Sequence, residues 1–180
     1  MLGQTNVILI GPMGSGKTAV GKHVARALQL QFWDSDAEIE RRTGVDIPLI
    51  FEKEGEAGFR QREREVLDDL APRPRIVLST GGGAILLAEN RVVLKRCGTV
   101  FYLETSVAQQ THRVKAGHQQ RPLLRSAEDP AVRLAALMAE RQPLYLETAD
   151  YTVRTDGRRV PSVAEEVVAK MRTAGRAHPG

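Results

Sequence analysis

The fold is decided by the stretch GPMGSGKT at residues 11–18, which matches the phosphate-binding loop pattern G-x-x-x-x-G-K-[ST]. An apolar run at residues 7–10 precedes it, and a segment with helical spacing of apolar residues, 19–30, follows it. This order of strand, glycine loop and helix is the context that the pattern requires. The sequence therefore predicts a loop built around a bound phosphate, rather than a glycine-rich turn before an ordinary helix.

Each part of this loop has a chemical task. The glycines at positions 11, 14 and 16 can adopt backbone angles closed to other residues, and they let the chain approach a phosphate closely. Successive N–H groups then point into one concavity, next to the positive end of the following helix. Lys17 can reach the β- and γ-phosphates of a nucleotide, and the Thr18 hydroxyl can ligate Mg²⁺.

The composition is that of one globular domain. The chain has 180 residues, of which 42% are hydrophobic and 27% charged. We find no run of 18 apolar residues and no charged leader before an apolar segment, so we expect no membrane span, no secretory signal and a cytoplasmic location. Cys97 is the single cysteine, which excludes an internal disulfide and fits a reducing compartment.

The charge balance points to small anionic substrates. The formal net charge is +4 and the isoelectric point about 9.5, which is compatible with nucleic acid, with anionic small molecules or with a solvated basic surface. The basic residues are scattered and aromatic residues make up only 4% of the chain, so stacking platforms for bases are poorly supplied. We therefore expect no nucleic-acid or membrane partner and a monomeric protein.

Strand-like and helix-like segments alternate along the chain, which predicts an α/β fold with a parallel sheet and right-handed crossovers. The predicted strands are residues 6–10, 32–33, 75–79, 99–103 and 150–154. The predicted helices are residues 19–30, 37–42, a short one capped by Asp46, 58–70, a short apolar one after Gly83, 91–96, 106–115, 130–145 and a last one around 163–171.

Two carboxylates follow the second predicted strand. Asp34 and Asp36 are two residues apart, so in an extended chain they point to the same side. In such sheets ligands bind beyond the carboxyl ends of the strands, where the glycine loop also lies. One carboxylate can then hold Mg²⁺ and the other can accept a proton from an attacking hydroxyl group. The alternative is that Asp34 only caps the next helix.

Three further features have both a functional and an ordinary explanation. Arg60 is either a fork for a substrate carboxylate or part of a solvated face that pairs with Glu56, and the pattern alone favours the solvated face. The triplet Gly81–Gly83 suggests a close approach of ligand to the backbone, since a plain turn needs only one glycine. Arg141 shares an apolar helical stripe, so it faces a cleft or binds terminal carbonyl groups.

The segment 117–122 is polar and lacks a packing stripe, as expected of a lid that closes over phosphates. Arg121 in this segment either stabilises the charge of the transferred group or is an exposed loop arginine. The four histidines have no ligand spacing, so we predict no zinc site.

Taken together, the motifs from residue 7 to residue 161 resemble those of shikimate kinases. The matching stretches are GPMGSGKT at 11–18, WDSD at 33–36, FRQRE at 59–63, LSTGGGA at 78–84, QRPLL at 120–124 and RQPLY at 141–145. The resemblance implies a three-layer P-loop NTPase fold, with five parallel strands in the order 2-3-1-4-5 and helices on both faces. It also implies a transferase that moves the γ-phosphoryl group of ATP to the 3-hydroxyl of shikimate, on the way to chorismate and aromatic amino acids.

The resemblance further implies roles at the acceptor side of the reaction. Asp36 would hold the reacting hydroxyl group and act as base, with Lys17 and Arg121 as the other catalytic residues. Arg60 and Arg141 would clamp the shikimate carboxylate, and Gly82 would contribute backbone.

On the nucleotide side, Thr18 and Asp34 would serve Mg²⁺. The residues that would bind the ATP co-substrate are Gly14, Ser15, Gly16, Lys17, Thr18, Ala19, Arg113, Arg121 and Arg159. One kinase domain would span residues 1–172, with a lid at about 113–126 and a disordered basic tail at 173–180.

Three alternatives remain, of which two belong to other functional classes. A P-loop kinase for another small hydroxy acid, such as gluconate, is the alternative within the same class. A guanine-nucleotide switch would need an Asp-x-x-Gly motif after the loop and an Asn-Lys-x-Asp motif, and we find neither. A silent nucleotide-binding adapter would not need Lys17, Asp34 and Asp36, all of which are present.

Overall fold

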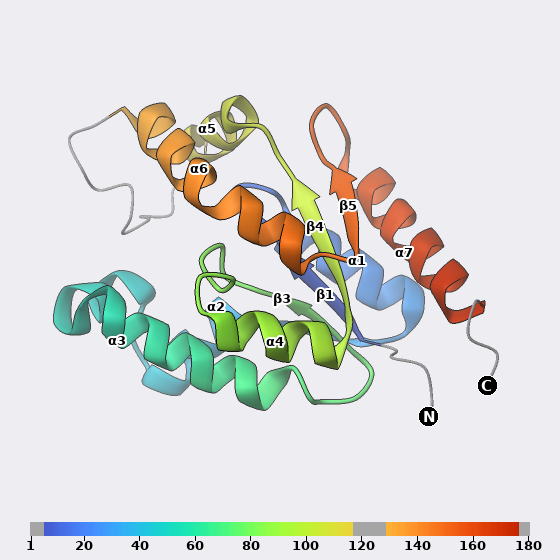
Figure 1. Ribbon diagram of the computed structural model, residues 1–180, viewed down its shortest axis with the longest axis horizontal. Coiled ribbons are helices and arrows are strands. Elements are labelled where there is room, and N and C mark those ends of the chain that lie inside the picture. Colours follow the sequence, from blue (N-terminus) through green and yellow to red (C-terminus); the bar gives the residue numbers. More distant parts are fainter. Residues whose placement is uncertain (1–5, 117–128, 177–180) are drawn as a thin grey trace.

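A computed structural model describes residues 6–116 and 129–176 of the chain, and its centre is a five-stranded parallel sheet (Figure 1). The order of the strands is β2-β3-β1-β4-β5, which confirms the predicted order. The strands are β1 (Val7–Ile10), β2 (Gln31–Asp34), β3 (Ile76–Ser79), β4 (Thr99–Glu104) and β5 (Tyr151–Arg154). The reversal of order between β3 and β4, on either side of β1, places the glycine loop at the point where such sheets bind ligands.

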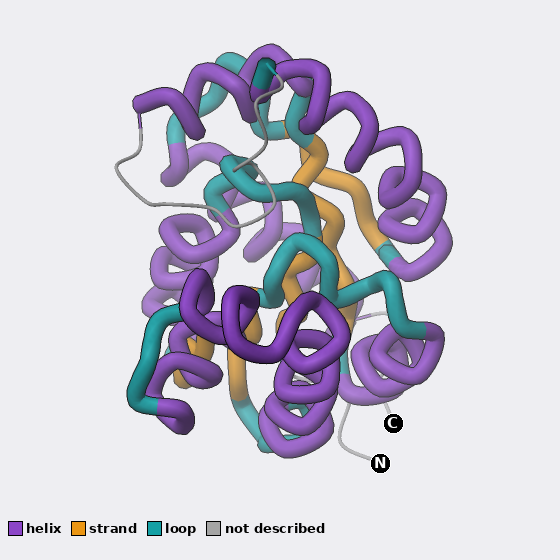
Figure 2. The backbone as a smooth tube through the Cα atoms, turned by 90° about the vertical axis from the view of Figure 1, so that its left-hand side faces the viewer, coloured by secondary structure: helices purple, strands orange, loops and turns teal. Residues whose placement is uncertain are grey.

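Helices cover both faces of the sheet, as Figures 1 and 2 show. Helices α1 and α7 pack together on one face, and α3, α4 and α6 lie on the other. The helices are α1 (Lys17–Leu28), α2 (Ser35–Thr43), α3 (Ile47–Leu70), α4 (Ala88–Cys97), α5 (Val107–Ala116), α6 (Pro130–Thr148) and α7 (Val160–Arg176). None of the helices in the described ranges is long and apolar enough to cross a membrane.

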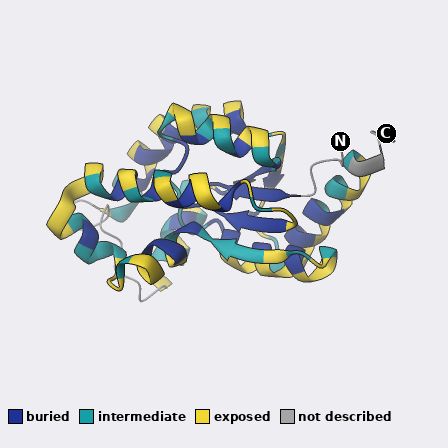
Figure 3. Ribbon diagram, turned by 90° about the horizontal axis from the view of Figure 1, so that it is seen from below, coloured by how far each residue is buried: buried dark blue, intermediate teal, exposed yellow. Residues whose placement is uncertain are grey.

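The core consists of two layers because successive side chains of a strand point to opposite faces. In β1, Val7 and Leu9 pack with α1 and α7, whereas Ile8 and Ile10 pack with the helices of the other face. All four side chains are fully buried, as the dark blue strands of Figure 3 illustrate. A strand buried on both faces explains why residues 7–10 form an uninterrupted apolar run.

Helix α3 replaces two predicted helices. Asp46 caps it as predicted, since its carboxylate accepts a hydrogen bond of 3.0 Å from the N–H of Leu49. Gly55 interrupts the helical geometry, with φ 70° and ψ −176°. The prediction of one helix after Asp46 and another from residue 58 thus gave both helical segments, but they are joined by a kink at Gly55 and not by a loop.

Other boundaries differ from the predictions. Residues 82–87 form turns, closed by bonds of 3.1 Å from Ala84 N to Gly81 O and from Leu86 N to Gly83 O, so the short helix predicted after Gly83 was wrong. The next helix, α4, begins at residue 88. Helix α7 continues to residue 176, beyond the boundary predicted at 172. Residue 113, the predicted start of the lid, lies within α5, and positions 117–126 lie outside the described residues.

Candidate active site

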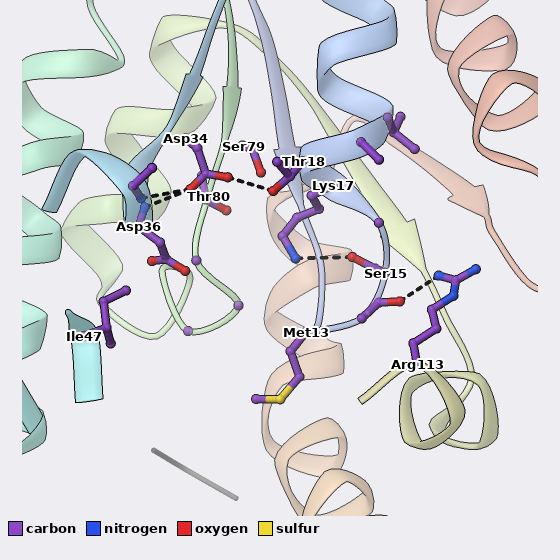
Figure 4. Close-up of a pocket in the computed structure, with 18 of the residues that line it drawn as sticks. Met13, Ser15, Lys17, Thr18, Asp34, Asp36, Ile47, Ser79, Thr80 and Arg113 are labelled. Carbon is purple, nitrogen blue, oxygen red and sulfur yellow. Dashed lines mark hydrogen bonds between the residues drawn. The ribbon is translucent and has the colours of Figure 1, made fainter. Parts of the chain in front are cut away.

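One cavity of about 1040 Å³ lies at the carboxyl ends of β1, β2 and β3 (Figure 4). The loop between β1 and α1 forms one wall of it, and side chains from α2, α3 and α6 form the others. The triple-glycine loop after β3 lies between these walls. The fold thus brings the glycine loop, Asp34, Asp36, Arg60, the glycine triplet and Arg141 to one cavity, and all of these were candidate functional residues in the sequence.

The glycine loop has the backbone expected of a phosphate cradle. Gly11, Gly14 and Gly16 have φ values of 148°, 76° and 86°, which other residues rarely adopt. Lys17 is only 8% exposed, and its Nζ donates to Gly11 O at 2.7 Å and to Pro12 O at 2.8 Å. The ammonium group therefore lies against the loop itself, at the edge of the cavity (Figure 4).

Thr18 and Asp34 form the pair predicted to serve a cation. The Thr18 hydroxyl donates to Oδ2 of Asp34 at 2.7 Å, so the two groups from α1 and β2 lie side by side. Oδ1 of Asp34 accepts from Asp36 N at 3.0 Å and caps α2, so the capping and functional interpretations of Asp34 are both compatible with its position. Hydroxyl and carboxylate oxygens are suitable ligands for Mg²⁺.

The protein supplies only part of a coordination shell at this position. Among residues 6–116 and 129–176, no three His, Cys, Asp or Glu side chains gather in a way that would hold a metal ion. Mg²⁺ usually keeps several waters and binds through one or two carboxylates together with substrate phosphates. Thr18 and Asp34 fit that arrangement, with the nucleotide phosphates as the remaining ligands.

Asp36 has the electrostatics of a proton acceptor. Burial raises its pKa from 3.8 to about 7, and the negative charges of Glu63 and Asp34 act in the same direction. Lys17 and Arg60 oppose that rise. A carboxyl group with a pKa near neutrality can take up and release a proton under ordinary conditions.

Arg60 is buried. The interpretation that it lies on a solvated face, which the charged residues around it favoured, was therefore wrong. Only 11% of its side chain is exposed, and it donates to Glu56 at 3.1 Å, the pair predicted from their spacing. It also donates to Glu63 at 2.8 Å. Burial raises the pKa of the Glu63 carboxyl above its ordinary value, and the charge of Arg60 opposes the rise.

Each glycine of the triplet 81–83 adjoins a different part of the cavity. A Cβ atom at Gly81 would lie 2.7 Å from both Oδ1 of Asp36 and Oε1 of Glu63. At Gly83 a Cβ atom would collide with the guanidinium group of Arg60. The three glycines were predicted to allow a ligand to approach the backbone closely. In the structure, the groups that lie close to Gly81 and Gly83 are the protein's own charged side chains.

Arg141 faces the cavity, as the cleft hypothesis predicted. It is 3% exposed, lines the cavity from α6, and its Nη1 would lie 3.6 Å from a Cβ atom at Gly82. The Nε–H groups of Arg60 and Arg141 are buried without a hydrogen-bond partner in the part of the chain that is described. Both guanidinium groups therefore keep donors for an anionic ligand.

The three arginines beyond residue 100 that were predicted to bind ATP do not share one position. Nη1 of Arg113 donates to Gly14 O at 2.6 Å, which joins α5 to the glycine loop. Arg159 is exposed and does not line the cavity, whereas its neighbour Arg158 does. Arg121 lies outside the described residues.

Some lining residues were missed by the analysis of the sequence. Ile47, Phe51 and Phe59 form an apolar wall, with the two phenylalanine rings 4.7 Å apart. Spacings of four and eight residues along a helix were the available signal. Glu63 was missed because it stands in a run of alternating charges, although its spacing of three from Arg60 permits their pairing.

Comparison with known proteins finds shikimate kinases both by sequence and by structure. A family model described as shikimate kinase matches residues 13–172. A shikimate kinase of Methylococcus capsulatus is 51% identical over 175 residues, which cover 97% of each chain. The solved structure of a shikimate kinase from Acinetobacter baumannii in complex with shikimate has a TM-score of 0.91 and 47% identity, covering 96% of this chain and 95% of that one. A gluconokinase from Sinorhizobium meliloti, with a TM-score of 0.58 and 16% identity, shares the fold only.

Proposed function

Because this chain belongs to the shikimate kinase family, we propose that its cavity transfers the γ-phosphoryl group of ATP to the 3-hydroxyl group of shikimate. The observation that carries the proposal is the composition of the cavity, in which a phosphate-binding loop and two buried arginines with unused donors share one space. The phosphate-binding loop is complementary to a nucleoside triphosphate, and the two arginines are complementary to an acceptor that carries a carboxylate.

At the acceptor side, Asp36 binds the reacting hydroxyl group and takes its proton as the oxygen attacks the γ-phosphorus. Its raised pKa supports this role, because the proton must be accepted near neutral pH. Arg60 and Arg141 hold the acceptor's carboxylate through hydrogen bonds in the plane of each guanidinium group. The backbone of Gly82 lies between Arg141 and the glycine loop, where it can donate to the acceptor.

At the donor side, the phosphates are surrounded by the backbone of Gly14, Ser15 and Gly16 and by the first turn of α1, which includes Ala19. Lys17 stabilises the negative charge of the transferred group. Thr18 and Asp34 would hold Mg²⁺, which neutralises phosphate charge when it is bound. Arg113 lines the cavity and holds the loop through its bond to Gly14 O, and Arg121 remains a predicted partner of the phosphates.

A coupled assay of ADP release tests this proposal. We expect turnover with shikimate and MgATP, no turnover above background with ATP alone, and loss of turnover in excess EDTA. Substitution of gluconate for shikimate tests the second candidate. Equal rates with gluconate, or a preference for GTP over ATP, would contradict the assignment.

A further inference from the structure

Tyr145 joins the two parts of the acceptor site that come from different elements. Its side chain is fully buried under α6, and its hydroxyl group donates to the carbonyl oxygen of Gly82. It lies four residues after Arg141, so both side chains are on one face of the helix. Burial raises the pKa of the Tyr145 hydroxyl above its ordinary value, and the charge and hydrogen bond of Arg141 oppose that rise.

The triple-glycine loop needs hydrogen bonds to hold its orientation, because glycine has the largest backbone freedom of any residue. Its outer carbonyls are bonded within the loop, Gly81 O by Ala84 N and Gly83 O by Leu86 N, each at 3.1 Å. The N–H of Gly81 donates to the Ser35 hydroxyl at 3.0 Å. The central carbonyl, Gly82 O, accepts a hydrogen bond from the buried Tyr145 hydroxyl of α6.

This pattern leaves two donors for a ligand. Within residues 6–116 and 129–176, the N–H groups of Gly82 and Gly83 donate to no other group. In a planar trans peptide the C=O and N–H groups point in opposite directions. A fixed Gly82 carbonyl therefore fixes the direction of the Gly83 N–H, and restrains the adjoining peptide.

We propose that Tyr145 is a positioning residue for the acceptor: its hydroxyl group, placed between Arg141 and the Gly82 carbonyl, orients the loop's free N–H groups and the guanidinium group together. This inference rests on the proposed function, since it concerns the binding of the same acceptor. The phosphate loop forms a different wall of the cavity, so we expect nucleotide binding to be largely independent of Tyr145.

A second tyrosine provides a matched control. Tyr102 of β4 stacks on Tyr145 with ring centroids 4.9 Å apart and is equally buried. Its hydroxyl group has no hydrogen-bond partner in the described part of the molecule. Tyr145→Phe and Tyr102→Phe each remove one buried hydroxyl from the same stack, but only the first removes a bond to the glycine loop.

The test measures steady-state kinetics, shikimate binding by calorimetry and melting temperature for the wild type and both variants. A neutral hydrogen bond is worth about 1 kcal/mol, so we expect Tyr145→Phe to raise the KM and Kd for shikimate roughly threefold to tenfold. The KM for MgATP should stay within about twofold of the wild-type value, and Tyr102→Phe should change neither KM. If Tyr145 had a purely structural role, we would not expect the KM for shikimate to change while the KM for MgATP stays the same.

Three results would overturn the inference: an unchanged shikimate KM in Tyr145→Phe, equal changes in both KM values, or the same effect in Tyr102→Phe. Failure of the proposed function is distinguishable, because the wild-type protein itself would then show no turnover with shikimate.

Discussion

Oδ1 of Asp36 and Oε1 of Glu63 are two buried carboxylate oxygens that face the same glycine. Both lack a hydrogen-bond partner in the described residues, and both would lie 2.7 Å from a Cβ atom at Gly81. Such acceptors are stable in a buried place only if water or a ligand supplies donors. The hydroxyl groups of a polyol acceptor are suitable donors, which supports the proposal that the pair serves the acceptor side of the site.

The substitution Asp36→Asn removes the proposed base while it preserves the shape of the side chain. We expect kcat to fall by about 10²–10⁴-fold, the usual contribution of general base catalysis. The Kd for ATP should stay near the wild-type value, because the base acts on the acceptor alone. Single-turnover kinetics and nucleotide titration measure the two quantities, and a variant with full activity would remove Asp36 from the role.

Arg60 is best tested by Arg60→Lys, since Arg60→Ala would leave the buried Glu63 carboxylate without its charged partner. Lysine keeps the charge but loses the planar fork that binds a carboxylate through two bonds. We expect the KM for shikimate to rise by roughly tenfold or more, equivalent to about 1.4 kcal/mol.

The control for Arg60 lies two residues away on the same helix. Arg62 is 40% exposed, and its guanidinium group binds Glu54 through bonds of 2.7 and 2.8 Å. Arg62→Lys should therefore leave the KM for shikimate unchanged. An equal effect of the two substitutions would show that Arg60 acts through the helix and not through the acceptor.

At the scale of elements, α2 contains a carboxylate that makes stability depend on pH. The Glu38 carboxylate is bound by Arg41 and Arg42, each at 2.7 Å. Its pKa is lowered from 4.5 to about 2, and the largest cause is the hydrogen bond from Arg41. A folded-state pKa below the unfolded value stabilises the protein above pH 4.5. This contribution disappears as the pH falls toward 2.

The variant Glu38→Gln should therefore flatten the dependence of the unfolding free energy on pH between 4.5 and 2. Urea unfolding at a series of pH values measures that slope. Glu52→Gln, on the exposed side of α3, is the control and should keep the wild-type slope. An identical slope in all three proteins would contradict the assigned pairing.

The kink of α3 separates two groups of residues that line the cavity. Ile47 and Phe51 precede Gly55, and Phe59 and Arg60 follow it. Gly55 has a combination of φ and ψ that is essentially restricted to glycine, and a Cβ atom there would touch nothing within 4 Å. Gly55→Ala thus tests backbone strain without a steric clash.

We expect Gly55→Ala to destabilise the fold by about 1–3 kcal/mol and to raise the KM for shikimate, because relief of the strain would move the two groups apart. Gly44 ends α2 with φ 71° and is equally open. Gly44→Ala should cost about 1 kcal/mol without a change in KM. Chemical denaturation and steady-state kinetics of both variants measure these effects. A Gly55→Ala protein with wild-type stability and wild-type KM would contradict the expectation.

The sequence predicted those elements whose signal is local. Apolar runs identified β1, β3 and β4, and the spacing around residues 11–18 located the nucleotide loop. Tyr145 and Glu63 were not identified because their roles depend on contacts between elements far apart in the sequence, with Gly82 for Tyr145 and near Gly81 and Asp36 for Glu63. Arg60 was placed on a solvated face for a related reason, since a helix rich in charges gives no periodicity that distinguishes a buried arginine from exposed ones.

For the whole molecule, the arrangement of one cavity with two chemically distinct halves makes stability depend on each ligand separately. A ligand that binds only the folded state stabilises it by about 2.7 kcal/mol at 100 times its Kd. For a domain of this size that corresponds to a rise of roughly 5–10 °C in Tm. We therefore expect MgADP and shikimate each to raise Tm, and their combination to raise it further.

Variants in the two halves should separate these effects. Lys17→Met should abolish the shift caused by MgADP and keep the shift caused by shikimate, because Lys17 belongs to the phosphate loop. Arg60→Lys should keep the shift caused by MgADP and reduce the shift caused by shikimate to about half, because a tenfold weaker affinity lowers the stabilisation from about 2.7 to about 1.4 kcal/mol at the same ligand concentration. Differential scanning calorimetry at saturating ligand measures all four shifts. If either variant lost both shifts equally, the division of the cavity into a nucleotide half and an acceptor half would be wrong, because a single local change would then control both sites.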